Sequence, residues 1–288
     1  MSGSTPTIVH RAGLCGSAPI VGAGPYHRRM DEAPATWAIL RGRVCQAPLP
    51  LCVRGPAACR TCRGPVRPGY ARCYQCDRHR GEAGGLLADA VAPISYAVRG
   101  GPLAADLWRY KSPAAGAAAA RARLRVLLLV FLRDHGECVW REAGMARPDM
   151  VAVVPSGTGR PGPHPLRELT AGYLSLPAAV LSVRRGAAER GREVNIAWLR
   201  TDHPVRGARV LLIEDTWVSG GSAQSAAAAL KLAGAARVAV VALGRHLDPA
   251  DRRSGPLAAS LRARHPWLAA CAVHPDLPVQ TAHSDQTR

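Results

Sequence analysis

Four cysteines in the first third of the chain have the spacing of a metal site. They form two Cys-x-x-Cys pairs separated by ten residues, with glycine and proline in between: Cys59, Cys62, Cys73 and Cys76. Each pair presents two sulfurs from a tight turn, and four thiolates can close as a tetrahedron on one Zn²⁺. Two disulfides are the alternative, but they need an oxidising compartment that nothing in the sequence indicates. Because four cysteines leave no open coordination position, we expect a structural zinc ribbon rather than a catalytic centre.

An acidic pair followed by a Gly/Ser loop is the second group of residues with recognisable chemistry. The apolar run Val210–Ile213 leads into two carboxylates, and the loop after them opens a helix. The loop's free N–H groups, its hydroxyls and the positive end of the helix form a cradle for a monophosphate. The carboxylates repel a phosphate but can accept hydrogen bonds from two sugar hydroxyls. We therefore expect a ribose 5-phosphate site made of Glu214, Asp215, Val218, Ser219, Gly220, Gly221 and Ser222, with solvated turn carboxylates as the alternative for the acidic pair.

Short apolar strands and helices must position these groups. Four runs are apolar on both faces, as parallel strands buried between helices should be: Val151–Val154, Ala178–Val183, Val210–Ile213 and Val238–Leu243. Helices are expected at Pro102–Lys111, Ala115–Arg133 and Ser222–Ala233. The last helix and its two flanking strands form a right-handed strand–helix–strand unit. The expected class is α/β, with a mostly parallel central sheet flanked by helices and with ligands at the carboxyl ends of the strands.

The acidic segment resembles the phosphoribosyl pyrophosphate (PRPP) motif of type I phosphoribosyltransferases. That motif has an apolar strand, two acidic residues, three variable positions, and then Ser/Thr, Gly, any residue and Ser/Thr; here the fixed positions are Glu214, Asp215, Ser219, Gly220 and Ser222. With the cysteine ribbon upstream, the chain is similar to the ComF family of amidophosphoribosyltransferase-like proteins over about residues 58 to 247. Further similarities are Leu107–Lys111, like a short helix ending in lysine, and the run from Arg192 to Ile196 before the motif strand. The resemblance implies a type I phosphoribosyltransferase fold with an N-terminal zinc ribbon.

The resemblance also implies a second loop and a reaction. Residues 155–160 would form the pyrophosphate loop, whose small residues let N–H groups approach an anion while arginine pairs with it. The implied pyrophosphate-binding residues are Ser156, Gly157, Thr158, Arg160, Arg184 and Arg185. Mg²⁺ would be held largely by pyrophosphate and ribose oxygens. Transfer of the phosphoribosyl group to a nitrogen nucleophile would release pyrophosphate beside Asp215 or Glu214, the implied catalytic residues.

The sequence departs from the family pattern in two places. ComF proteins usually carry Arg-Gly-Phe-Asn-Gln after the pyrophosphate loop, whereas this chain has Pro-Gly-Pro-His-Pro at residues 161–165. The acceptor substrate is therefore left open, and His164 is either a general base or an exposed loop histidine. In the motif itself, Thr216, Trp217 and Val218 replace smaller residues, so Trp217 either stacks on a base or packs in the interior.

Two other functions are compatible with parts of the sequence. Gly157–Gly162 after a strand matches the dinucleotide-binding fingerprint, but prolines stand where its helix must begin and run. A non-enzymatic alternative is a PRPP- or nucleotide-binding protein of the ComF type that acts in DNA uptake or contacts DNA through the ribbon. The arginines around the cysteines would make that contact: Arg60, Arg63, Arg67, Arg72, Arg78 and Arg80. A basic face that includes the ribbon would favour this alternative.

Composition and charge bear on whether the chain is a nucleic-acid-binding, membrane or secreted protein. The chain has 288 residues, 48% of them hydrophobic, and a formal net charge of +18; Lys111 and Lys231 are the only lysines among its 38 basic residues. Because the arginines are spread along the whole chain, a compositional origin of the charge is favoured over a dedicated nucleic-acid surface. The longest apolar run, Val126–Leu132, is too short to span a membrane, and no secretory signal is recognisable. We expect a cytoplasmic protein.

Four segments are expected along the chain. Residues 1–55 form an extension that is disordered because it is rich in Gly, Ser, Pro and Ala; residues 56–80 form the ribbon; residues 88–250 form the phosphoribosyltransferase-like domain; residues 251–288 form a tail with one helix at Pro256–Ala272. The other five cysteines have no partner spacing and are expected to be ordinary thiols: Cys15, Cys45, Cys52, Cys138 and Cys271.

Overall fold

The computed structural model describes residues 38–40, 42–43, 49–52, 54–113, 116–156, 164–170, 172–184, 191–261 and 271–273. A five-stranded sheet in the order β1–β7–β6–β2–β3 forms the centre of the described part, and every neighbouring pair in it is parallel. Its strands are β1 (Ala90–Val98), β2 (Met150–Val153), β3 (Ala178–Ala179), β6 (Arg209–Trp217) and β7 (Arg237–Leu247). A separate antiparallel pair consists of β4 (Leu181–Val183) and β5 (Leu199–Thr201).

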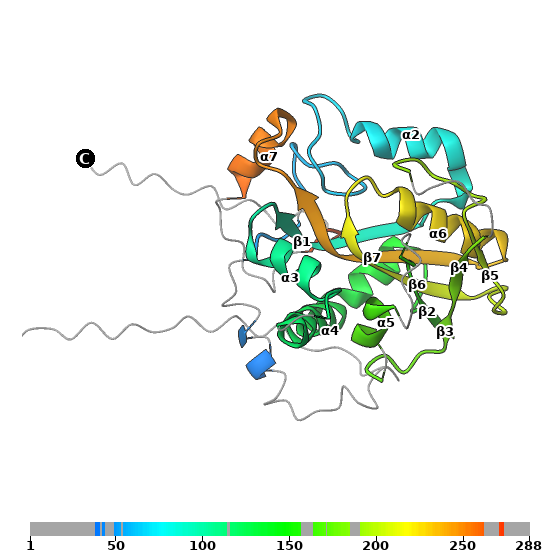
Figure 1. The fold of residues 1–288 in the computed structure, drawn as a ribbon. Coiled ribbons are helices and arrows are strands. Elements are labelled where there is room, and N and C mark those ends of the chain that lie inside the picture. Colours follow the sequence, from blue (N-terminus) through cyan, green and yellow to red (C-terminus); the bar gives the residue numbers. More distant parts are fainter. Residues whose placement is uncertain are drawn as a thin grey trace, which may run out of the picture.

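Helices cover both faces of the sheet (Figure 1). One face carries α3 (Pro102–Arg109), α4 (Ala117–Glu142) and α5 (Pro165–Thr170); the other carries α2 (Tyr74–Ala83), α6 (Gly221–Leu232) and the β4–β5 pair. Short helical turns complete the described elements: η2 (Gly84–Leu86), η3 (Arg252–Ser254) and α7 (Gly255–Ser260). In β6, Leu211 and Ile213 join the core on the α4 side, while Val210 and Leu212 join the core on the α6 side. The expected α/β class with a parallel sheet between helices is confirmed.

The strand–helix–strand unit that carries the acidic pair is β6–α6–β7. Its two strands are parallel neighbours, as expected. The first strand is longer than the predicted run Val210–Ile213, because Glu214 and Thr216 continue to pair with Ala242 and Gly244 of β7. The acidic pair therefore lies inside the strand, near its carboxyl end, and not in the turn that follows it.

Three other elements differ from the expected ones. The single strand expected at Ala178–Val183 is two strands, since β3 continues the main sheet beside β2 while β4 pairs with β5. The helix expected to end at Arg133 continues to Glu142. The edge strand β1 was not among the expected strands; it pairs in parallel with β7 although Pro93 interrupts its apolar run.

The structure also describes short segments on either side of the domain expected at residues 88–250. Residues 50–52 lie antiparallel to β1, with the Cys52 N–H bonded to the Ile94 carbonyl and the Tyr96 N–H bonded to the Pro50 carbonyl. Leu51 and Cys52, at the end of the segment expected as an extension, are buried. The helix expected at Pro256–Ala272 is α7, which ends at Ser260; residues 262–270 lie outside the described residues, and Cys271 and Ala272 are not helical. Among the described residues, no helix has the length and apolar character needed to cross a membrane.

Candidate functional site

The four cysteines of the ribbon come together in space. Their sulfur atoms all lie within 4.8 Å of one another, and those of Cys62 and Cys73 are 3.7 Å apart. The N–H of Gly64 donates to the Cys62 sulfur at 3.4 Å, and Arg63 adopts a left-handed conformation, with φ of 56°, to make this turn. No described cysteine forms a disulfide. Four sulfurs within one coordination sphere, with an N–H group donating to one of them, fit a structural zinc ion.

A buried guanidinium lies beside the thiolates. Four thiolates around Zn²⁺ carry a net negative charge, and Arg245 of β7 is buried next to them. Burial by itself would lower the pKa of Arg245, but the negative charge of the ribbon sulfurs, above all Cys62, raises it. Its Nη1 also donates to the Trp217 carbonyl oxygen at 3.0 Å. A side chain at Gly64 would overlap the guanidinium, so Arg245 would have to move if this glycine were replaced. Arg245 thus links the ribbon to the last residue of β6.

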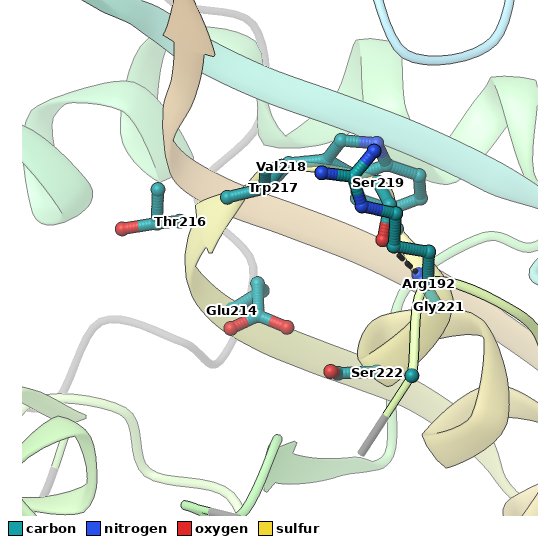
Figure 2. Close-up of a pocket in the computed structure, with 10 residues that line it drawn as sticks. Arg192, Glu214, Thr216, Trp217, Val218, Ser219, Gly221 and Ser222 are labelled. Atoms are coloured by element: carbon teal, nitrogen blue, oxygen red, sulfur yellow. Dashed lines mark hydrogen bonds between the residues drawn. The ribbon is translucent and has the colours of Figure 1, made fainter. Parts of the chain in front are cut away.

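A pocket of about 260 Å³ opens at the carboxyl end of β6. The end of the strand, the following loop, the start of α6 and a segment from residue 191 line it: Gly191, Arg192, Glu214, Thr216, Trp217, Val218, Ser219, Gly220, Gly221 and Ser222. Figure 2 shows the Glu214 carboxylate and the Ser222 hydroxyl pointing toward the same space. Of the residues predicted to bind ribose 5-phosphate, all except Asp215 line this pocket.

The loop owes its shape to two glycines and a buried tryptophan. Gly220 adopts φ of 89° as the N-cap of α6, and a side chain there would overlap the Trp217 ring. Trp217 is 1% exposed, so it packs in the interior, which is one of its two predicted roles. The Gly221 N–H donates to the Ser219 hydroxyl at 3.3 Å. The N–H groups of the first turn of α6 then face the pocket with the positive end of the helix.

Arg192 is a pocket residue that sequence reasoning did not place in the site. In the sequence only the family similarity of residues 192–196 marks it, because it belongs to no local pattern and reaches the loop from a distant segment. The carbonyl of Arg192 is 3.0 Å from Nε2 of His79 on α2, and the Asn195 N–H donates to the Ser225 hydroxyl of α6 at 2.8 Å. The ribbon helix and α6 therefore hold the arginine segment against the pocket.

The second carboxylate of the acidic pair faces a different environment. Neighbouring residues of a strand point to opposite faces, so Asp215 turns away from the pocket that Glu214 lines. Its Oδ2 accepts a hydrogen bond from the Tyr110 hydroxyl at 2.5 Å and lies 2.5 Å from Lys111 Nζ. The structure thus brings one of the two predicted carboxylates into the pocket and pairs the other with a lysine.

The charges around Asp215 keep it ionised. Burial by itself would raise its pKa, but the charge and hydrogen bond of Lys111, the Tyr110 hydroxyl and the nearby His164 together lower it below its ordinary value. His164 is half-buried, and its Nδ1 accepts a hydrogen bond from the Leu166 N–H at 3.2 Å. His164 therefore lies near the Asp215 side of β6 and does not line the pocket.

Replacing Lys111 by methionine is expected to change how stability depends on pH. In the wild type, the lowered pKa of Asp215 adds stability above the unfolded value of 3.8, and this stability is lost as the pH falls through the folded value. Without the ammonium group, burial raises the folded pKa, so ionising Asp215 costs stability as the pH rises through it. In thermal melts, we expect the variant to be less stable by about 1–2 kcal/mol near neutral pH, and the difference to disappear only as the pH falls below 3.8 toward the lowered folded pKa of Asp215. Lys111→Arg keeps the charge, so its stability should follow that of the wild type. If Lys111→Met lost the same stability at every pH, Lys111 would not be the group that keeps Asp215 ionised.

The residues predicted to bind pyrophosphate are only partly described. Ser156 follows β2 at its carboxyl end, and Arg184 follows β4, where its Nε donates to the Leu199 carbonyl at 3.1 Å. Neither residue lines the pocket beside Glu214. Gly157, Thr158, Arg160 and Arg185 lie outside the described residues.

Comparison with known proteins finds similarity in structure only. No protein-family model and no curated protein sequence matches the chain. The chain is similar to a purine phosphoribosyltransferase from Pyrococcus horikoshii Ot3, at 15% identity and a TM-score of 0.29, over 46% of this chain and 88% of that one. It is similar to an orotate phosphoribosyltransferase from Mycobacterium tuberculosis H37Rv, at 22% identity and a TM-score of 0.30, over 56% and 84% of the two chains. A phosphoribosyltransferase from Corynebacterium diphtheriae has 25% identity and a TM-score of 0.28, over 50% and 74%. Because these TM-scores are low, the architecture rests on the strand order and pairing described above.

Proposed function

We propose that the chain binds PRPP and transfers its 5-phosphoribosyl group to a nitrogen nucleophile. The observation that carries this proposal is the combination of a helix N-terminus, the Ser219 and Ser222 hydroxyls and the Glu214 carboxylate around one pocket at the carboxyl end of a parallel strand. N–H groups and hydroxyls bind a phosphate, whereas a carboxylate there is useful only to a neutral group that donates hydrogen bonds, such as a sugar hydroxyl. Phosphate and hydroxyls side by side describe ribose 5-phosphate.

The proposal gives the phosphate and the ribose of PRPP separate binding groups in the pocket. The first turn of α6 and Ser222 bind the 5-phosphate, and Arg192 adds a positive charge at the same place. Glu214 accepts hydrogen bonds from the ribose hydroxyls and stabilises the positive charge that develops on the ribose as pyrophosphate leaves. Mg²⁺ would bind to the pyrophosphate and ribose oxygens and neutralise the leaving group.

The proposed reaction breaks one bond and forms another at the anomeric carbon. The bond from this carbon to the pyrophosphate oxygen breaks, and pyrophosphate leaves with the electron pair. The nitrogen lone pair forms the new bond, and the nucleophile then loses a proton. The proton passes to water, because Asp215 and His164 lie on the other side of β6 and do not line the pocket.

Calorimetric titration with PRPP and Mg²⁺ tests the proposal. We expect saturable binding by the wild type and an affinity about 10- to 100-fold lower in Glu214→Gln, because a hydrogen bond to a charged group contributes about 1.5–3 kcal/mol. Glu137→Gln is the matched control, since this exposed glutamate of α4 lies outside the pocket. Absence of PRPP binding by the folded wild type would contradict the proposal. If PRPP binds, release of pyrophosphate with ammonia, glutamine or nucleobases as acceptors distinguishes a transferase from a binding protein.

A basic groove beside the ribbon supports a second candidate function, nucleic-acid binding without catalysis. The groove has a volume of about 850 Å³, and its cationic lining residues are Arg54, Arg60, Arg63, Arg72, Arg80 and Lys231. Arg54 and Lys231 form ion pairs, and Arg63 donates to main-chain carbonyls. Within the described residues, the three others have no carboxylate partner: Arg60, Arg72 and Arg80. Exposed Tyr70 and Tyr74 on the ribbon add rings on which bases can stack.

Fluorescence anisotropy with a labelled single-stranded oligonucleotide tests the second candidate. Alanine at Arg60, Arg72 and Arg80 should weaken binding and reduce the salt dependence of log K by about 2, because each lost phosphate contact on a single strand accounts for about 0.7. The control variant removes the same charge outside the groove, at Arg99, Arg200 and Arg253. Equal losses in the two triple variants would show that only the overall charge of the chain attracts the oligonucleotide.

A further inference from the structure

A second group of metal-binding side chains lies outside the ribbon. Ligand atoms of His135, Cys138 and Cys271 all lie within 4.8 Å of one another. His135 and Cys271 are 2% and 4% exposed, and Cys138 is half-buried. The spacing of the five remaining cysteines in the sequence suggested only ordinary thiols, so this group is a product of the fold.

Two separate parts of the structure bring these residues together. His135 and Cys138 are three residues apart on α4, which places them on the same face of the helix. Cys271 comes from the C-terminal side, and the residues after it are held by two arginines of the N-terminal part. Arg63 Nε donates to the Ala272 carbonyl at 2.6 Å, and Arg54 Nη2 donates to the Val273 carbonyl at 3.3 Å. Hydrogen bonds that do not involve sulfur therefore hold the segment of Cys271 in place.

We propose that His135, Cys138 and Cys271 bind a second zinc ion. One imidazole and two thiolates are soft to borderline ligands that suit Zn²⁺. Bonds of about 2.3 Å to sulfur and about 2.0 Å to nitrogen place tetrahedral ligand atoms about 3.5–3.8 Å apart, so the observed group needs only small side-chain rotations to close on an ion. The fourth position is open to water or to a small external ligand.

The charge balance of such a site suits its buried position. Zn²⁺ with two thiolates and a neutral imidazole has no net charge, so the ion needs no buried counter-charge. The four-thiolate ribbon has a net negative charge under the same count, and there Arg245 is buried beside the sulfurs. The second ion would connect α4 to the segment at residues 271–273 and would hold two distant parts of the chain together.

Metal content of the full-length chain, purified without a polyhistidine tag, tests this proposal. We expect Cys271→Ser and Cys138→Ser each to contain about one zinc ion per chain less than the wild type. Cys52→Ser is the matched control, because Cys52 is also buried but belongs to neither cysteine group. In the Co²⁺-substituted protein, sulfur-to-metal charge-transfer absorption should fall by about a third in Cys271→Ser, since two of six thiolate bonds are lost.

Two results would overturn the proposal. The first is an equal zinc content in the wild type and in both serine variants. The second is a non-reducing peptide map of the wild type that finds Cys138 and Cys271 joined by a disulfide. If a serine variant does not fold, His135→Gln takes its place, because it removes one ligand without changing a thiol. None of these variants changes a ribbon cysteine or a residue of the phosphate pocket, so a difference in zinc content reports on the second site alone.

Discussion

Serine in place of Cys62 is expected to lower both the stability of the whole chain and its affinity for a phosphate-containing ligand. The variant removes one of the four ribbon sulfurs and leaves Arg245 buried without its principal negative partner. Breaking a buried charged cluster costs about 3–5 kcal/mol, which corresponds to a melting temperature lower by about 10 °C for a chain of this size. Zinc analysis and a thermal melt measure the two parts of this effect.

The loss of ligand affinity follows from two contacts between the ribbon and the pocket. Arg245 donates to the Trp217 carbonyl, at the start of the phosphate loop, and His79 of the ribbon helix bonds to the Arg192 carbonyl. When the ribbon loses its metal, both supports move, and the pocket loses its preorganised geometry. We expect PRPP affinity to fall at least about tenfold at a temperature where the variant is still folded.

The control for this experiment is a buried cysteine outside the ribbon. Cys52→Ser makes the same chemical change at a fully buried position and should keep the ribbon zinc and the ligand affinity. A Cys62→Ser protein that loses its ribbon zinc yet binds PRPP like the wild type would show that the ribbon and the pocket are independent.

Alanine in place of Gly221 is expected to disrupt the phosphate loop. A side chain at this position would overlap the Glu193 carbonyl and the Arg192 main chain, which cannot move aside as a flexible side chain can. Overpacking of this kind costs about 1–3 kcal/mol. The segment of Arg192 would have to shift away from α6, so the arginine would leave the pocket. We expect a lower melting temperature and a PRPP affinity lower by about tenfold or more in calorimetry.

Gly81→Ala is the matched control for Gly221→Ala. Gly81 lies in α2, and a side chain there would meet no atom within 4 Å. Alanine in a helix is favoured over glycine by up to about 1 kcal/mol, so this variant should be as stable as the wild type or more so. An unchanged PRPP affinity in Gly221→Ala would contradict the assignment of this loop as the phosphate site.

The elements predicted correctly from the sequence are those whose partners lie close to them in the chain. The β6–α6–β7 unit was expected because apolar runs and a small-residue helix follow one another within a few dozen residues. The edge strand β1, whose apolar run contains Pro93, was not expected, and its parallel pairing with β7 is visible only in the tertiary structure. The division of residues 178–183 into two strands also required knowledge of their partners, β2 and β5.

The amino-acid sequence by itself determined two groups of functional residues that are close in the chain: the four cysteines, and the Gly/Ser loop after an acidic pair. Both depend on residues close in the chain, where turn geometry follows from spacing and residue type. The tertiary structure decided which carboxylate enters the pocket, because the paired length of β6 fixes the face to which Glu214 and Asp215 point. It also decided the partners of Lys111, Arg192 and Arg245, since those contacts join segments far apart in the sequence and leave no periodic pattern in it.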